Sequence, residues 1–209
     1  MRYILRMIIA PAVYFFCFVI AALGIQSFNG LQMAGRIILG AVCLVIYILC
    51  VTGIMLKEGE NAFSKLLSND MQRKNMIKTG KDTDIDDRTE YRPYKAFLSG
   101  LVCCIPLIVL FIIHLVVREP GETSQISKIA EILYSPFFLF FGNYKTSNEI
   151  SFFIGSAFTV VIFPCLMGVP YIFGAHKRKA QNDAIVDLNK YLHGDEEWEL
   201  LVVCSRVEN

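Results

Sequence analysis

The chain has 209 residues, of which 55% are hydrophobic and 19% are charged, with a formal net charge of +1 and a mean hydropathy of +0.49. An apolar content this high excludes an ordinary soluble domain of this size and indicates a membrane protein. We expect no nucleic-acid partner.

Four long stretches without a charged residue predict the fold. They contain 29, 20, 22 and 27 residues, and a helix needs about 20 residues to cross a hydrocarbon core about 30 Å thick. We therefore expect an all-α integral membrane protein with four transmembrane helices, near residues 7–26, 36–56, 96–117 and 150–174. The first stretch is longer than the apolar core of a signal peptide, so we expect it to remain as a span.

The Lys and Arg residues predict the orientation of these helices. The amino end, the 57–95 segment and the tail hold 16 of them, whereas the two connections on the opposite side hold four. Basic residues concentrate on the cytoplasmic side of membrane proteins, so we expect both termini in the cytoplasm. The seven cysteines lie in the expected helices or in the cytoplasmic tail, which argues against a disulfide framework.

The chain thus divides into four parts. Residues 1–56 supply the first two transmembrane helices, and residues 57–95 form a charged cytoplasmic loop. Residues 96–174 supply the third and fourth, which are joined by an outer interfacial aromatic segment at 124–144. Residues 175–209 form a cytoplasmic tail.

The cytoplasmic loop combines a short helix with two patches of opposite charge. Phe63, Leu67 and Met71 are spaced by four residues. This spacing predicts an amphipathic helix that ends near Gly80 and lies on the inner leaflet. The basic patch is a candidate contact for lipid or for a partner, and it consists of Arg73, Lys74, Lys78 and Lys81.

The acidic run that follows contains Asp82, Asp84, Asp86 and Asp87. A helix-loop-helix calcium site needs glycine at its sixth position and glutamate at its twelfth, but those positions hold Asp87 and Pro93. We therefore expect a solvated run or a docking surface for a basic partner, and we keep a divalent-cation site as the alternative.

The predicted spans carry few polar features. Ionisable residues mark ion pathways in membranes, and none lies at depth in these four stretches. Helix kinks are predicted at Pro106, Pro164 and Pro170. Kinked helices line binding sites in transporters, but proline is also common in membrane helices in general. The sequence contains no metal, nucleotide or nucleophile motif, so we expect no catalytic residue, metal site or cofactor.

An aromatic segment follows the third predicted span. It is uncharged, too short to cross the membrane, and contains Phe137, Phe138, Phe140 and Phe141. Aromatic rings favour the headgroup level, so we expect this segment to anchor in lipid or to dock on the membrane surface of a partner.

The tail contains a further helical pattern. Ile185, Leu188 and Leu192 share one face and predict a short cytoplasmic helix that ends at Gly194. Residues 200–204 form a β-favouring run that is too short to make a sheet alone.

These features lead to three hypotheses about function. The first is a non-enzymatic accessory or scaffolding subunit of a complex in a bacterial inner membrane, with the lipid bilayer and other membrane proteins as partners. The second is a channel or transporter that forms its pathway as a homo-oligomer. The third is a membrane-embedded enzyme that acts on lipid, which no motif supports.

Overall fold

The computed structural model describes residues 2–27, 33–80, 85, 87–116, 129, 132–133, 136 and 149–204. Its elements are α1 (Arg2–Ser27), α2 (Met33–Thr79), the 3-10 turn η1 (Asp87–Thr89), α3 (Tyr94–Val116) and α6 (Glu149–Cys204). Within these described ranges the chain contains helices and no strand, which confirms the all-α fold class.

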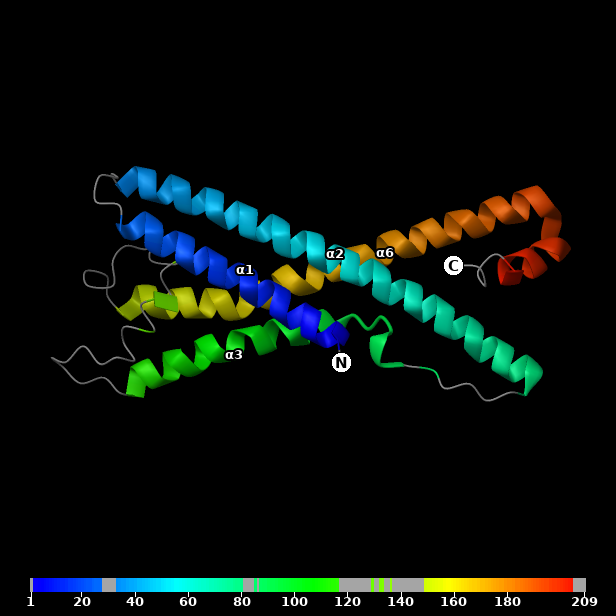
Figure 1. Cartoon of the computed structure of the whole chain (residues 1–209), viewed down its shortest axis with the longest axis horizontal. Coiled ribbons are helices and arrows are strands. Elements are labelled where there is room, and N and C mark those ends of the chain that lie inside the picture. The colour runs from blue at the N-terminus through cyan, green and yellow to red at the C-terminus, as the bar shows by residue number, and fades with distance from the viewer. Residues whose placement is uncertain are drawn as a thin grey trace.

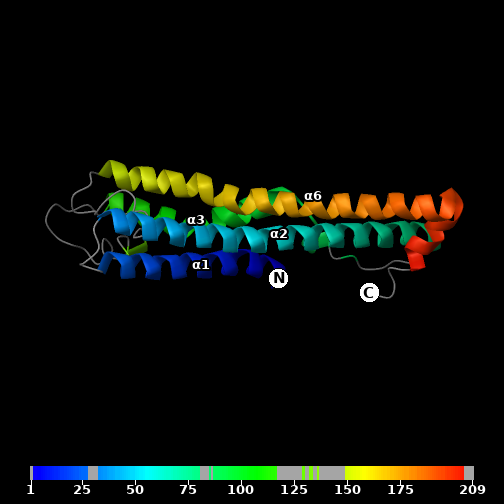
Figure 2. The ribbon, with the colours of Figure 1, turned by 90° about the horizontal axis from the view of Figure 1, so that it is seen from above.

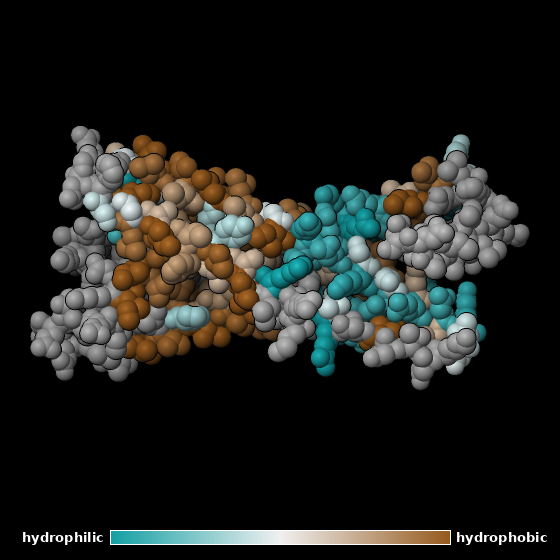
Figure 3. Space-filling view, in the orientation of Figure 1, coloured by the Kyte–Doolittle hydropathy of each residue, from teal (hydrophilic) through white to brown (hydrophobic). Residues whose placement is uncertain are grey.

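The four helices form an elongated bundle that is apolar at one end and polar at the other. All four lie together in one half, and α2 and α6 cross near the middle of the molecule and diverge as they continue into the other half (Figure 1). The view from above shows α2 and α6 extending beyond α1 and α3 toward the same end of the molecule (Figure 2). Apolar side chains dominate the four-helix half, and polar side chains dominate the half beyond the crossing (Figure 3).

Among the residues that the structure describes, three helical segments are long and apolar enough to cross a membrane. They are Arg6–Ser27, Ala34–Thr79 and Val160–Leu188. The described apolar part of α3, Tyr94–Val109, is shorter. The structure thus supports a membrane-embedded protein in which three helices qualify as spans by length and composition.

An aromatic core holds the apolar half together around Tyr47 of α2. The Tyr47 ring stacks on Phe18 of α1 with centroids 5.7 Å apart and contacts Phe163 of α6 at 6.0 Å. Phe15 meets Tyr47 and Phe163 edge to face, at 6.4 and 5.8 Å. Such edge and stacked contacts add to the burial of large apolar surface. Cys104 brings α3 into the same buried cluster.

The outer surface of this half is also apolar. Side chains that are more than half exposed include Phe16, Ile38, Leu49, Leu98 and Val161. So large an apolar surface would aggregate in water, whereas lipid tails cover it without penalty.

Two glycines allow α2 and α6 to touch at their crossing. A Cβ at Gly59 would collide with the backbone carbonyl of Tyr171, and a Cβ at Gly174 would collide with the carbonyl of Leu56. The backbones therefore meet without intervening side chains, as small residues permit in membrane helix pairs. We call residues 60–79 of α2 and 175–191 of α6, which extend beyond this crossing, the arms.

The three prolines predicted to kink helices all lie inside continuous helices. Pro106 is in α3, and Pro164 and Pro170 are in α6. Pro164 packs against Gly100 of α3. A Cβ added at Gly100 would lie only 2.6 Å from the Cα of Pro164. Pro164 therefore has a packing role between α3 and α6, and the kinks themselves stay a prediction.

The short helix expected to lie on the inner leaflet is not a separate element. Residues 57–79 are helical, as predicted, but they continue α2 without a break and do not form a helix of their own. The position of this helix on the inner leaflet stays a prediction. No proline interrupts the helix there, and Gly59 is held by its contact with α6. The predicted end is confirmed, because Gly80 has φ +66° and its amide donates to the Met76 carbonyl at 2.8 Å.

The tail helix is likewise a continuation, in this case of α6. The helix passes through Gly194 and includes residues 200–204, so both the predicted stop and the predicted β-favouring run were wrong. The intervening sequence, Glu196 to Leu201, is rich in strong helix formers, and their summed propensity outweighs one glycine and the valines that follow.

Candidate functional site at the polar end of the bundle

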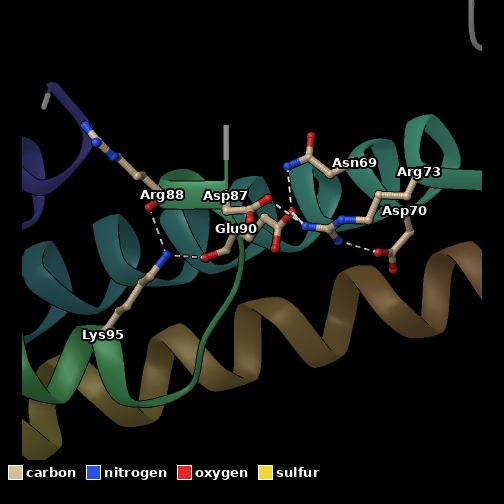
Figure 4. Close-up of polar contacts among 7 residues, drawn as sticks. All are labelled: Asn69, Asp70, Arg73, Asp87, Arg88, Glu90 and Lys95. Carbon is tan, nitrogen blue, oxygen red and sulfur yellow. Dashed lines mark hydrogen bonds and ion pairs between the residues drawn. The ribbon is translucent and has the colours of Figure 1, made fainter. Parts of the chain in front are cut away.

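A cluster of polar side chains lies where the apolar half ends. The chain returns from α2 to α3 through η1 and residues 90–93, and this segment packs beside the α2 arm (Figure 4). The contributing residues are Asn69, Asp70, Arg73, Asp87, Arg88, Glu90 and Lys95. We call this group the Arg73 cluster.

Arg73 joins the α2 arm to the returning segment. One of its terminal nitrogens lies 2.8 Å from Asp70 Oδ1, and the other lies 2.7 Å from Asp87 Oδ1 and 2.6 Å from Glu90 Oε1. Asn69 Nδ2 also donates to Glu90 Oε1 at 2.7 Å. The Glu90 side chain is only 7% exposed. A buried carboxylate is stable only with such partners, so Arg73 and Asn69 fix the position of Glu90.

Lys95 locks the backbone of the same segment. Its ammonium donates to the carbonyl oxygens of Arg88 at 2.9 Å and Glu90 at 2.6 Å. The amide of Glu90 donates to the Asp87 carbonyl at 3.3 Å, and the amide of Lys95 donates to the Arg92 carbonyl at 3.1 Å. The turn into α3 is therefore held by hydrogen bonds at both ends.

An aromatic stack couples this turn to the helix crossing. Tyr91 stacks on Tyr171 of α6 with centroids 5.4 Å apart and meets Phe63 of the α2 arm edge to face at 6.1 Å. Tyr171 is fully buried, and its carbonyl is the group that faces Gly59. Burial raises the pKa of Tyr91, because desolvation disfavours the phenolate.

Polar contacts also join the two arms just beyond the crossing. Lys177 Nζ lies 2.8 Å from Glu60 Oε1. Arg178 Nε donates to Ser64 Oγ at 2.9 Å. Both contacts are exposed and contribute little stability, and they link α2 and α6 just beyond the crossing.

The structure separates the residues of the predicted basic patch. Arg73 is held among carboxylates of the chain itself, while Lys74 and Lys78 are exposed farther along the α2 arm. At 1.5 Å per residue, Lys74 lies about 22 Å beyond Gly59, well clear of the apolar surface. Lys74 and Lys78 as contacts for a partner stay a prediction.

Of the predicted acidic run, Asp87 is described and belongs to the Arg73 cluster. The other predicted residues lie outside the described residues, and they are Lys81, Asp82, Asp84, Asp86, Phe137, Phe138, Phe140 and Phe141. Among the residues that the structure describes, no group of three His, Cys, Asp or Glu side chains could hold a metal ion.

Sequence reasoning missed Glu90, Asn69 and Lys95. It treated the basic and acidic patches as separate surfaces, although neighbouring patches of opposite charge on one loop can fold onto each other. The sequence contained one signal for this contact. Arg73 lies on the same side of the α2 arm as the apolar stripe, and Glu90 is next to the aromatic Tyr91.

Chemically, this arrangement is a fixed junction. The described carboxylates of the returning segment face Arg73, and the Lys95 ammonium faces backbone carbonyls. The junction thus ties the α2 arm, the start of α3 and the helix crossing into one unit. The chain matches no family model, no curated protein and no solved structure.

Proposed function

We propose that this protein is a non-enzymatic accessory or scaffolding subunit of a membrane complex, and that its arms are the surface that binds the partner. In this proposal the chain crosses a bacterial inner membrane four times, with α3 (Tyr94–Val116) as the third span. Both termini and both arms lie in the cytoplasm, in keeping with their basic residues.

The observation that carries the proposal is the projection of two helical arms beyond the apolar bundle (Figures 1 and 3). The α2 arm continues for 20 residues after Gly59, which corresponds to about 30 Å. A protein that needed only to fill the bilayer would have no use for such extensions. Long helices held in a fixed crossing suit the docking of another subunit.

The arms expose apolar side chains within a polar surface. Ile77 is 85% exposed on the α2 arm, and Tyr191 is 88% exposed on the α6 arm. Ile185 and Leu188 are more than half exposed on the same arm. Apolar residues rimmed by charge are typical of protein interfaces, since association removes them from water.

The charges beside Ile77 indicate the kind of partner. Lys74 and Lys78 are exposed within one turn of Ile77 on the α2 arm. A partner surface that is apolar at its centre and acidic at its rim is complementary to this group.

Site-specific photocrosslinking in the native membrane tests the proposal. A photoreactive residue would replace Ile77 or Tyr191, with Gln72 as an exposed control on the α2 arm and Ile38 as a control on the apolar surface. We expect crosslinks from Ile77 or Tyr191 to a different polypeptide that also copurifies in fixed ratio after gentle extraction. A homo-oligomer alone would overturn the proposal in favour of a channel or transporter, and a bare monomer would overturn it in favour of a lipid-active enzyme.

A further inference from the structure

The start of α3 combines a cationic residue, a tyrosine and an exposed apolar stripe. Arg92 donates to the Tyr94 hydroxyl at 3.1 Å, just before the helix begins. Tyr94 is 54% exposed, so its hydroxyl and the Arg92 guanidinium face outward together. The pKa of Arg92 is raised by its hydrogen bond to Tyr94, and Arg92 therefore stays charged.

An apolar stripe continues directly from Tyr94 along α3. Leu98, Leu101 and Ile105 follow Tyr94 at four, seven and eleven residues, which places all of them on one face of the helix. Each of the three is close to half exposed or more. Among the described helices they face away from the buried core, so the stripe lies on the surface that lipid covers.

Beyond the hydrogen bond to Tyr94, Asp87 and Glu90 are also close enough to Arg92 to raise its pKa. The described carboxylates of the same segment, Asp87 and Glu90, contact Arg73 on the α2 arm. The side chain of Arg88 extends away from those carboxylates, in the direction opposite to Arg73 (Figure 4). Lys95 holds the backbone of the turn, so the segment that carries Arg92 is ordered before any ligand arrives.

The start of α3 lies where the apolar half of the bundle ends. Tyr94 is more than half exposed there, and tyrosine is enriched where lipid headgroups meet hydrocarbon. A phosphate at this level would meet Arg92 and the Tyr94 hydroxyl, and the attached acyl chain would run along Leu98 toward Ile105.

We propose that Arg92 and Tyr94 bind the phosphate of an anionic phospholipid whose acyl chain lies along the exposed stripe of α3. Arginine suits this role because its planar guanidinium pairs with phosphate oxygens through more than one hydrogen bond. The stripe selects a lipid over a free phosphate, because only a lipid covers Leu98, Leu101 and Ile105 as well. This site is independent of the partner-binding role proposed for the arms.

Native mass spectrometry of the intact protein tests this site. The full chain would be placed in vesicles of phosphatidylglycerol and phosphatidylcholine in equal amounts, and the ratio of the two lipids that remain bound would be measured. We expect the wild type to retain phosphatidylglycerol in preference. Arg92→Gln should reduce that preference about fivefold, the value of one basic side chain at an anionic surface. Tyr94→Phe should reduce it in the same direction, since it removes only the hydroxyl.

Lys78→Gln is the matched control, because it also removes one exposed positive charge but lies on the α2 arm and not on the α3 stripe. If the Arg92 and Tyr94 site is specific, the preference should not change in this variant. An equal loss in Lys78→Gln and Arg92→Gln would overturn the proposal in favour of general charge attraction. Displacement of the bound lipid by inorganic phosphate would overturn it in favour of a free-anion site, as would an unchanged preference in a correctly folded Arg92→Gln protein.

Discussion

Gly59 of α2 lies directly against the backbone carbonyl of Tyr171 in α6, so close that a Cβ at position 59 has no room. Tyr171 in turn stacks on Tyr91 of the returning segment. One backbone contact therefore sets both the angle of the arms and the position of the turn into α3.

Gly59→Ala should destabilise the fold. The added methyl group must push α2 and α6 apart, and overpacking of this kind costs about 1–3 kcal/mol. Gly53→Ala is the matched control on the same helix, because nothing lies within 4 Å of a Cβ there. The control should be neutral or more stable by up to about 1 kcal/mol, since alanine favours helix over glycine. Thermal unfolding in detergent, followed by circular dichroism, measures both, and equal melting temperatures would contradict the close contact.

The Arg73 cluster should respond asymmetrically to the loss of its members. Arg73→Gln leaves the buried Glu90 carboxylate without its cation, whereas Asp87→Asn removes an exposed partner that is 57% accessible. Arg73→Gln should therefore lower the melting temperature more than Asp87→Asn does, because an unpaired buried charge is worse than a lost surface pair.

The double variant Arg73→Gln with Glu90→Gln provides the control for this prediction. It removes both charges while Asn69 can still donate to the amide oxygen at position 90. Its stability should recover part of the loss caused by Arg73→Gln alone, and this coupling is measured by a double-mutant cycle. Strictly additive effects would show that the two side chains do not interact in solution.

Much of the bundle could be predicted from charge-free runs, because the bilayer imposes a length and a composition on any helix that crosses it. The end of α2 at Gly80 was also predictable, since a glycine with φ +66° closes a helix. The continuity of α2 past residue 57 was not. The charges that begin at Lys57 end the apolar run but not the helix, and the sequence does not show that Gly59 meets Tyr171, which lies 112 positions away.

The side-chain contacts of the Arg73 cluster could not be predicted from the sequence either. The sequence shows a basic patch followed by an acidic run, and it does not show that Asp87 and Glu90 turn back onto Arg73. That return depends on the stack of Tyr91 on Tyr171, which comes from the other end of the chain. Long-range packing therefore decided which charges became internal partners.

Tyr47→Phe should leave the fold as stable as the wild type or make it more stable. The Tyr47 hydroxyl is buried and makes no hydrogen bond within the described part of the chain. An unsatisfied buried polar group costs about 1–3 kcal/mol, so its removal relieves a penalty while the ring contacts remain. Tyr47→Ala is the comparison, because it also deletes the ring that joins Phe18 and Phe163. That variant should lose about 3–5 kcal/mol. A clear loss of stability in Tyr47→Phe would indicate a partner for the hydroxyl.

The two arms should be labelled from the same side of the membrane. Both extend from the same end of the apolar bundle (Figure 1), so in a membrane they share one compartment. In a cysteine-free background, Ile77→Cys and Tyr191→Cys should react with a membrane-impermeant maleimide from the same face only, which is the cytoplasmic face in the orientation proposed above. Ile38→Cys, which faces the apolar surface, should stay unlabelled in either orientation until detergent is added. The opposite result would be labelling of the two arms from opposite faces. It would contradict the crossing of α2 and α6 at Gly59 and Gly174, because two helices that continue in the same direction from this contact must end on the same side of a bilayer.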